Sequence, residues 1–138
     1  MKAYIDSSVL LRVAFRSPNP LAIWNEIEYH VSSSLLRVEC ARALQRMRFD
    51  KNISATQIWE RSAAVQSIIE QIDLVAMDDE VLDRASGAFV APLKSLDAIH
   101  LATAMMWRDH KRLGLAFATH DYTLARSARY AGFEVLGP

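Results

Sequence analysis

The chain has 138 residues, of which 51% are hydrophobic, and its 16 basic and 16 acidic side chains give a formal net charge of zero. This length fits one folding domain over residues 1–138, and the apolar content is sufficient for a buried core. The balanced charge excludes attraction of a polyanion by the chain as a whole, and the single cysteine, Cys40, excludes an internal disulfide. Early charged residues interrupt any signal-peptide pattern and no long apolar run occurs, so we expect a cytoplasmic protein without membrane contact.

Strand and helix patterns alternate along the chain. The first half predicts a strand at 2–5, helices at 9–15 and 21–28, a strand at 30–32, and helices at 34–47 and 54–69. The second half predicts a strand at 73–77, helices at 79–89 and 95–110, a strand at 115–119, a helix at 122–131 and a strand at 133–136. Ser54 and Gln57 form a capping-box pattern, Ser95 is placed to cap its helix, and Gly132 is placed to end the last one.

This alternation predicts the α/β class, with helices on both faces of a mainly parallel sheet. Ligands of such sheets bind at the carboxyl ends of the strands. Asp6 directly follows the first predicted strand, and Asp121 lies just beyond the strand that ends near Thr119. We therefore expect these two acids, which are distant in the sequence, to lie at the same edge of the sheet.

Asp97 lies in a predicted helix that is apolar on nearly every side, a pattern typical of a buried helix. A buried carboxylate has to be hydrogen-bonded, ion-paired or bound to a cation. Asp97 also falls in the first turn of this helix, where the helix dipole favours an acid that has no further role. The residue by itself supports both interpretations equally.

The other acids have ordinary structural explanations too. Glu39 falls on the flank of the apolar face of its helix, where it either borders a cleft or forms an ion pair with Arg42. Asp6 and Asp121 occupy positions where acids commonly cap the following helix. Taken singly, these residues do not define a site.

Taken together, the four acids favour a metal site. Carboxylate oxygens in a small cluster suit Mg²⁺ or Mn²⁺, and without a cation their charges repel one another. Three of the acids have a hydroxyl residue nearby, namely Ser8, Ser95 and Thr119. An ion held in this way supports phosphodiester hydrolysis, because it acidifies water and neutralises the phosphate. The expected ligands are Asp6, Glu39, Asp97 and Asp121.

Further candidates carry weaker signals. His100 lies one turn beyond Asp97, where it either orients a substrate or is a hydrogen-bonded core residue, and His120 is a candidate for the same cleft. One basic stretch comprises Arg37, Arg42, Arg46, Arg48 and Lys51. This stretch is either a local nucleic-acid contact or a solvated helix face.

Four short segments occur in a characteristic order and spacing. They are residues 4–8 (YIDSS), 33–39 (SSLLRVE), 95–104 (SLDAIHLATA) and 119–121 (THD). Together they closely resemble the signature segments of PIN-domain ribonucleases of the VapC toxin type. The resemblance runs nearly end to end and includes the final AGFEV at 131–135.

The resemblance implies a Rossmann-like α/β/α sandwich and a Mg²⁺- or Mn²⁺-dependent endoribonuclease that cleaves RNA such as tRNA or rRNA. It also implies a homodimer and an antitoxin protein bound across the cleft. The implied acidic metal site is Asp6, Glu39, Asp97 and Asp121, with Ser8 and Thr119 as supporting hydroxyls. Many relatives carry a further acid shortly after the fourth segment. Residues 122–125 contain none, which argues against a second tightly held metal ion.

Two other classes also gather aspartates at strand ends. A receiver domain, which is a non-catalytic binding module, has adjacent acids early in the chain and a lysine late in the sheet, and neither feature occurs here. A haloacid-dehalogenase-like phosphatase has a second aspartate two residues after the first, where this chain has Ser8. The ribonuclease interpretation is therefore preferred, with a receiver-like module as the alternative.

Overall fold

A five-stranded sheet forms the centre of the computed structural model, which describes residues 1–138. The strands are β1 (Lys2–Ile5), β2 (Tyr29–Ser33), β3 (Ile72–Val75), β4 (Ala116–Ala118) and β5 (Val135–Leu136). They lie in the order β3-β2-β1-β4-β5, and every neighbouring pair is parallel. The prediction of an α/β protein with a mainly parallel sheet is confirmed, since the sheet is parallel throughout.

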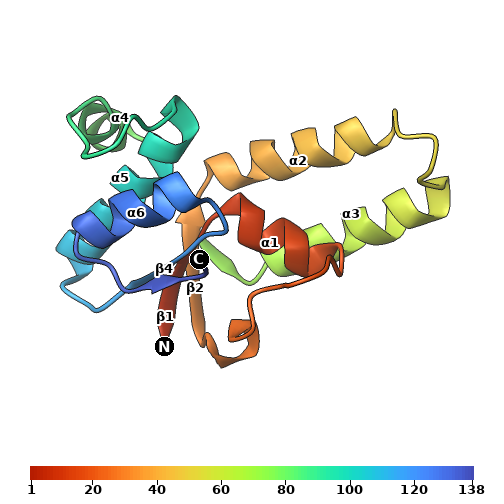
Figure 1. The fold of residues 1–138 in the computed structure, drawn as a ribbon, viewed down its shortest axis with the longest axis horizontal. Helices are drawn as coiled ribbons and strands as arrows, with labels where there is room; N and C mark the ends of the chain where they lie inside the picture. The colour runs from red at the N-terminus through yellow and green to blue at the C-terminus, as the bar shows by residue number, and fades with distance from the viewer.

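Six α-helices accompany the sheet (Figure 1). They are α1 (Ser7–Ala14), α2 (Leu35–Met47), α3 (Ala55–Ile69), α4 (Asp79–Ala85), α5 (Ser95–Lys111) and α6 (Tyr122–Tyr130). Successive side chains of a strand point to opposite faces, so Ala3 and Ile5 pack in the cluster of α1, α2 and α3. Tyr4 and Phe117 pack on the other face, against α5 and α6. The result is the expected α/β/α sandwich.

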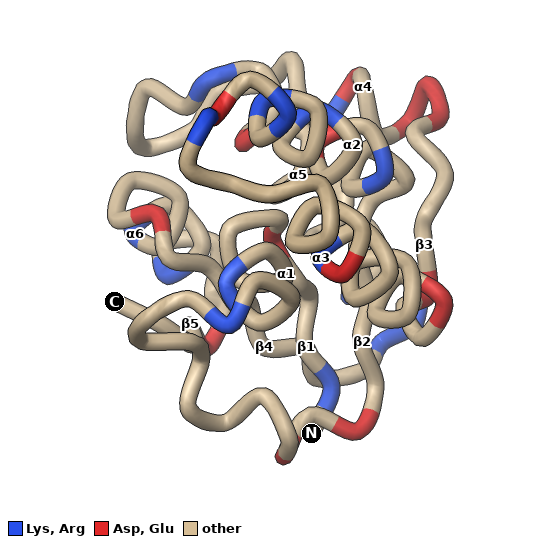
Figure 2. The backbone as a smooth tube through the Cα atoms, turned by 90° about the vertical axis from the view of Figure 1, so that its right-hand side faces the viewer, with Lys and Arg blue, Asp and Glu red and all other residues tan.

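The antiparallel pair of α2 and α3 extends away from the sheet, and Figure 2 views the molecule from the side toward which this pair points. The helix α3 begins as predicted. Ser54 accepts a hydrogen bond from the Gln57 backbone N–H, and the Gln57 side chain accepts one from the Ser54 N–H. This capping box satisfies two backbone donors that the first turn of a helix leaves free.

Some predicted boundaries are wrong. No α-helix covers residues 21–28, where the only helical piece is the 3₁₀ turn η1 (Trp24–Glu26). Leu21 and Ile27 are buried against the same core cluster, and they pack individually as the chain returns to the start of β2. The helix predicted to reach residue 89 ends at Ala85, where the Ser86 hydroxyl bonds to the Leu82 carbonyl.

Two predicted helix ends have opposite outcomes. Ser95 is the first residue of α5 and does not cap it, because the N-cap position is occupied by Lys94 without a side-chain hydrogen bond. Gly132 follows α6 with φ of +85°, a conformation that glycine adopts without strain, and this confirms its predicted role. No helix of the structure is both long enough and apolar enough to cross a membrane.

Candidate active site

The candidate site begins where β1 and β4 end side by side. Ile5 pairs with Ala118 in the parallel register, so the next residues, Asp6 and Thr119, emerge at the same edge of the sheet. The Asp6 N–H extends the ladder by donating to the Ala118 carbonyl at 3.0 Å. The sequence-based expectation of an acid at this edge is met for Asp6, which is only 5% exposed.

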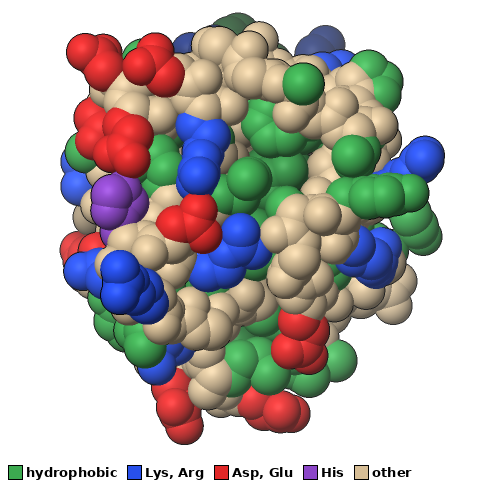
Figure 3. Space-filling view, turned by 90° about the vertical axis from the view of Figure 1, so that its left-hand side faces the viewer, with side chains coloured by type: hydrophobic (Ala, Val, Ile, Leu, Met, Phe, Trp, Pro, Cys, Tyr) green, Lys and Arg blue, Asp and Glu red, His purple; other side chains and the backbone are tan.

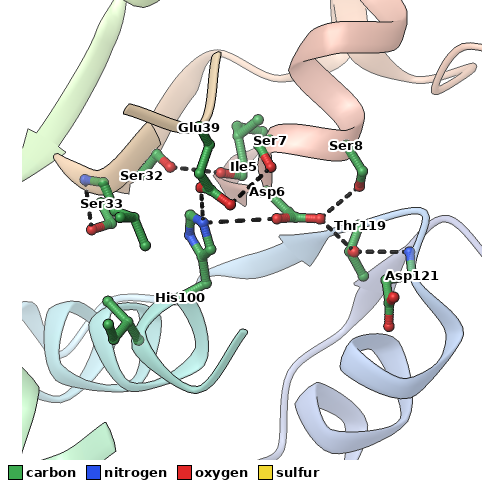
Figure 4. A network of polar contacts seen from close by, with 12 residues as sticks. Ile5, Asp6, Ser7, Ser8, Ser32, Ser33, Glu39, His100, Thr119 and Asp121 are labelled. Carbon is green, nitrogen blue, oxygen red and sulfur yellow. Dashed lines mark hydrogen bonds and ion pairs between the residues drawn. The ribbon is translucent and has the colours of Figure 1, made fainter. Parts of the chain in front are cut away.

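The Asp6 carboxylate is turned into the site and does not cap α1. Asp6 occupies the N-cap position of that helix, yet its side chain makes no capping hydrogen bond. Its Oδ2 atom instead accepts hydrogen bonds from the Ser8 hydroxyl at 2.6 Å and the Thr119 hydroxyl at 2.9 Å (Figure 4). The capping explanation for Asp6 is therefore wrong.

Both hydroxyls are fixed in direction by the backbone. The Thr119 hydroxyl accepts the Asp121 N–H, and the Ser8 hydroxyl accepts the His120 N–H, each at 3.0 Å. A hydroxyl has one hydrogen to donate, and here that hydrogen goes to Asp6. The chain thus holds the Asp6 carboxylate in one orientation from two sides.

Glu39 reaches the same edge from α2. Its Oε1 atom contacts the Nε2 atom of His100 on α5, and its Oε2 atom accepts a 3.3 Å hydrogen bond from Ser7. No ion pair with Arg42 forms, so the surface-pair explanation for Glu39 is wrong. The Glu39–His100 contact joins the two helical layers across the ends of the strands (Figure 4).

His100 is fully buried and both of its ring nitrogens have partners. Nδ1 lies 2.7 Å from the Tyr4 hydroxyl, and Nε2 contacts Glu39 and lies 3.9 Å from Asp6 Oδ1. Burial lowers the pKa of His100, but the hydrogen bond with Glu39 and the charge of Asp6 raise it by more, so the pKa lies above its ordinary value. The residue is both a hydrogen-bonded core histidine and a part of the site.

Asp97 lies in the first turn of α5, half-buried and without any hydrogen-bond partner. Burial, together with the negative charges of Asp6 and Asp121, raises the pKa of this carboxyl to about 6. Asp6, Asp121 and Glu39 are thus near enough for their charges to act on Asp97. A carboxylate in this position is destabilised until a proton or a cation compensates its charge.

Asp121 serves as the N-cap of α6, because its Oδ1 atom accepts the Leu124 N–H at 2.7 Å. The capping explanation is therefore correct for this acid, although its charge also raises the pKa of Asp97. As arranged, no three histidine, cysteine, aspartate or glutamate side chains lie close enough together to hold one ion directly. The structure thus gathers the four predicted acids at one edge without forming a complete coordination shell.

Known proteins resemble this chain over nearly its whole length. The PIN domain family model matches residues 3–130. The chain belongs to the PIN-domain family. Ribonuclease VapC46 of Mycobacterium tuberculosis (strain ATCC 25618 / H37Rv) is 36% identical over 141 residues, covering 98% of this chain and 96% of that protein. Ribonucleases VapC47 and VapC35 of the same species (strain CDC 1551 / Oshkosh) are 28% and 29% identical, with the same coverage.

The resemblance to VapC-type PIN domains drawn from the four segments is therefore confirmed, and the receiver-like and phosphatase-like alternatives fall away. Within this PIN domain, sequence reasoning missed two residues: Tyr4, which contacts His100, and Ser7, which donates a hydrogen bond to Glu39. A signal for Tyr4 existed, since residues two apart in a strand share a face and Tyr4 precedes Asp6 by two.

Two other features of this PIN domain lie outside the acidic edge. The His120 ring lines a separate cavity with Arg12 and Leu136, and its Nε2 atom is buried without a partner. A cavity of about 670 Å³ lies between α2, α3 and the edge strand β3, and none of the four acids lines it. The fixed hydroxyls and the carboxylates that raise the pKa of Asp97 lie at the acidic edge and not in these two cavities.

Proposed function

We propose that this PIN domain is a divalent-metal-dependent endoribonuclease and the toxin of a toxin–antitoxin pair. The observation that carries the proposal is the half-buried Asp97 carboxylate, which has no hydrogen-bond donor and whose pKa is raised by burial and by Asp6 and Asp121. The names of the three relatives, all ribonucleases of the VapC type, support the reaction and the RNA substrate.

The donor set fits Mg²⁺ or Mn²⁺, which prefer carboxylate and water oxygens. Mg²⁺ is commonly held by one or two carboxylates with water in the remaining positions, so the lack of a three-residue cage is no obstacle. Asp6 Oδ1 accepts no hydrogen bond and both oxygens of Asp97 are free, so these two residues would hold the ion directly. Glu39, whose two oxygens already contact His100 and Ser7, would act through bound water. Asp121, whose Oδ1 atom caps α6, would reach the ion through its Oδ2 atom, directly or through water.

In phosphodiester hydrolysis, the ion and the side chains of this site would have different roles. A bound Mg²⁺ supplies positive charge at the scissile phosphate and lowers the pKa of water. Ser8 and Thr119 hold Asp6 in one orientation, which keeps its free oxygen directed into the site. Glu39, fixed by His100 and Ser7, is placed to orient a water molecule beside the two acids. The charge of the ion would compensate the Asp97 carboxylate, which has no hydrogen-bond donor of its own.

A basic surface on α2 and on the turn that follows it supports an RNA substrate. Arg37, Arg42, Arg46, Arg48 and Lys51 are all exposed, and none has a carboxylate within ion-pair distance. Figure 2 colours lysine and arginine blue and views the molecule from the side toward which α2 and α3 point. The opposite side differs, because Figure 3 shows basic and acidic side chains mixed there, and Arg84 and Arg108 both pair with Asp109. Unpaired arginines on the helix that carries Glu39 are available to phosphates.

Exposed apolar side chains support the proposal that this chain binds other proteins. Apolar side chains exposed on the surface include Val38, Phe49, Trp59, Tyr122 and Tyr130. Such residues commonly mark interfaces, so we expect a homodimer and an antitoxin protein that covers the cleft. We also expect the protein to act in the cytoplasm, on tRNA or rRNA.

Expression in a bacterial host tests the biological role. Induction of the wild-type chain should stop growth and degrade specific RNAs, whereas Asp97→Asn should do neither at the same protein level. Co-expression of the neighbouring antitoxin gene should restore growth. Normal growth with accumulated, folded wild-type protein would contradict the toxin role.

A further inference from the structure

A buried chain of hydrogen bonds runs from the backbone of β2 to Glu39. The Ser33 N–H donates to the Tyr4 hydroxyl at 3.0 Å, and that hydroxyl lies 2.7 Å from His100 Nδ1. The other ring nitrogen, Nε2, contacts Glu39 Oε1. Tyr4 and His100 are both fully buried, so neither is a surface group that meets the chain by chance.

The direction of the last bond follows from its surroundings. The Nε2 atom of His100 faces only carboxylates, Glu39 in contact and Asp6 Oδ1 at 3.9 Å. A carboxylate accepts hydrogen bonds and has no hydrogen to give, so Nε2 must carry one. This holds for the neutral ring and for the charged ring alike, and His100 is therefore a donor to Glu39 in either state.

Tyr4 is suited to both states of the ring. Its hydroxyl accepts the Ser33 N–H and can either donate to an unprotonated Nδ1 or accept from a protonated one. Burial raises the pKa of Tyr4, so its proton stays in place. The two rings pack edge to face with centroids 5.8 Å apart, and this packing adds to the contacts at both ring nitrogens that orient the imidazole.

We infer that His100, aligned by Tyr4, is a positioning residue that keeps Glu39 at the acidic edge. Glu39 has a long side chain on the flank of α2, and Asp6 and Asp97 both repel its charge. Without a donor from the opposite helical layer, Glu39 would turn toward solvent, since the 3.3 Å bond from Ser7 is the only other hydrogen bond of its side chain. This inference rests on the proposed function, because it assigns Glu39 a place beside the bound cation.

Mn²⁺ affinity of the purified protein, measured by calorimetry without RNA, tests the inference. His100→Leu removes the donor and should weaken Mn²⁺ binding about 10-fold or more, the usual effect of losing a group that orients a metal ligand. His100→Gln keeps an N–H that reaches Glu39 and should restore most of the affinity. His30→Leu is the matched control, because His30 lies on β2 beside Trp24 with its Nε2 atom unpartnered, and it should bind Mn²⁺ as the wild type does.

The role of Tyr4 is tested by a double-mutant cycle. Tyr4→Phe should weaken Mn²⁺ binding in the wild type and have no further effect in the His100→Leu background, because the hydroxyl acts through the ring. Nitrogen-15 NMR of the histidines is a second measurement, and it uses the wild-type protein, so it does not depend on whether a variant folds. The His100 Nε2 atom should carry a slowly exchanging hydrogen at every pH at which the protein is folded.

The outcomes separate the two proposals. Full Mn²⁺ affinity in folded His100→Leu, or a wild-type spectrum with a bare Nε2 atom, overturns the positioning role and leaves the proposed ribonuclease intact. A wild-type protein that binds no Mn²⁺ and cleaves no RNA overturns the proposed function and this inference with it. Loss of affinity in His100→Leu with recovery in His100→Gln supports both.

Discussion

The Thr119 hydroxyl donates a 2.9 Å hydrogen bond to Asp6 Oδ2 across the ends of two neighbouring strands. Thr119→Val keeps the shape of the side chain but removes this donor and the acceptor of the Asp121 N–H. Loss of both bonds should lower the free energy of unfolding by about 1 to 3 kcal/mol. Because Asp6 is then held only by Ser8, RNA cleavage should also fall, by about 10-fold.

Thr119→Ser is the matched control for this prediction, since serine retains the hydroxyl and loses only a methyl group. Urea denaturation and cleavage assays on both variants check the expectation. Equal activity of the valine and serine variants would mean that the orientation of Asp6 does not depend on Thr119.

Asp121 combines a structural role with a proposed chemical one, and two substitutions separate them. Asparagine is as good an N-cap as aspartate, so Asp121→Asn should keep the melting temperature and lose part of the RNA cleavage. Asp121→Ala also loses the bond to the Leu124 N–H and should cost about 1 kcal/mol of stability. Equal cleavage by the wild type and Asp121→Asn would restrict this residue to capping.

The raised pKa of Asp97 predicts how stability depends on pH in the metal-free protein. Between its ordinary value of 3.8 and its folded value of about 6, the folded state binds more protons than the unfolded state. The contribution of Asp97 to the free energy of unfolding is therefore fully present below pH 4, and it is lost as the pH rises to about 6. Asp97→Asn removes this loss and should be more stable than the wild type at pH 7.5, by about 1 to 2 kcal/mol after allowance for solvent screening.

Denaturation of both proteins in EDTA at pH 4 and pH 7.5 checks the sign. The two stability curves should diverge as the pH rises, and Mg²⁺ should raise the stability of the wild type more than that of Asp97→Asn. Parallel curves would show that Asp97 is not crowded by the other acids.

The unpaired arginines of α2 should govern the salt dependence of RNA binding. The double variant Arg42→Ala/Arg46→Ala should reduce the slope of log K against log salt by about 1 to 1.5 for a single-stranded RNA. Arg84→Ala is the control, because Arg84 is paired with Asp109 on the other side of the molecule. Fluorescence titrations with a catalytically inactive background variant provide the measurement. An unchanged slope in the double variant would place the RNA elsewhere.

Much of the fold was predictable because local patterns determine it. The strand at residues 2–5, the capping box at Ser54 and the helix end at Gly132 each depend on a few neighbouring residues, and each appears in the structure. The rule that parallel strands end at a common edge also predicted that Asp6 and Asp121 lie at the same edge of the sheet. Residues 21–28 were assigned wrongly because their apolar residues are buried by contacts with distant elements, which the helical spacing alone does not reveal.

The internal organisation of the site was not predictable in the same way. The partners of His100 lie 96 and 61 residues away in the sequence, so its bonds to Tyr4 and Glu39 depend on how the two helical layers meet. The position of Glu39 was not predictable for the same reason. Arg42 is a possible ion-pair partner close in the sequence, but Glu39 contacts the distant His100 instead. Asp6 and Asp121 occupied equivalent N-cap positions in the sequence, and only the structure distinguishes the inward carboxylate from the capping one.

Metal-dependent cleavage of a test RNA by the purified chain tests the central claim most directly. Wild-type protein should cut a single-stranded RNA in Mg²⁺ and stop when EDTA is added, and Asp6→Asn should be at least about 100-fold slower while keeping its fold and melting temperature. The asparagine oxygen still accepts the hydrogen bonds from Ser8 and Thr119, so a loss of rate reports the lost charge. Cleavage that persists in EDTA, or full activity of Asp6→Asn, would contradict the account.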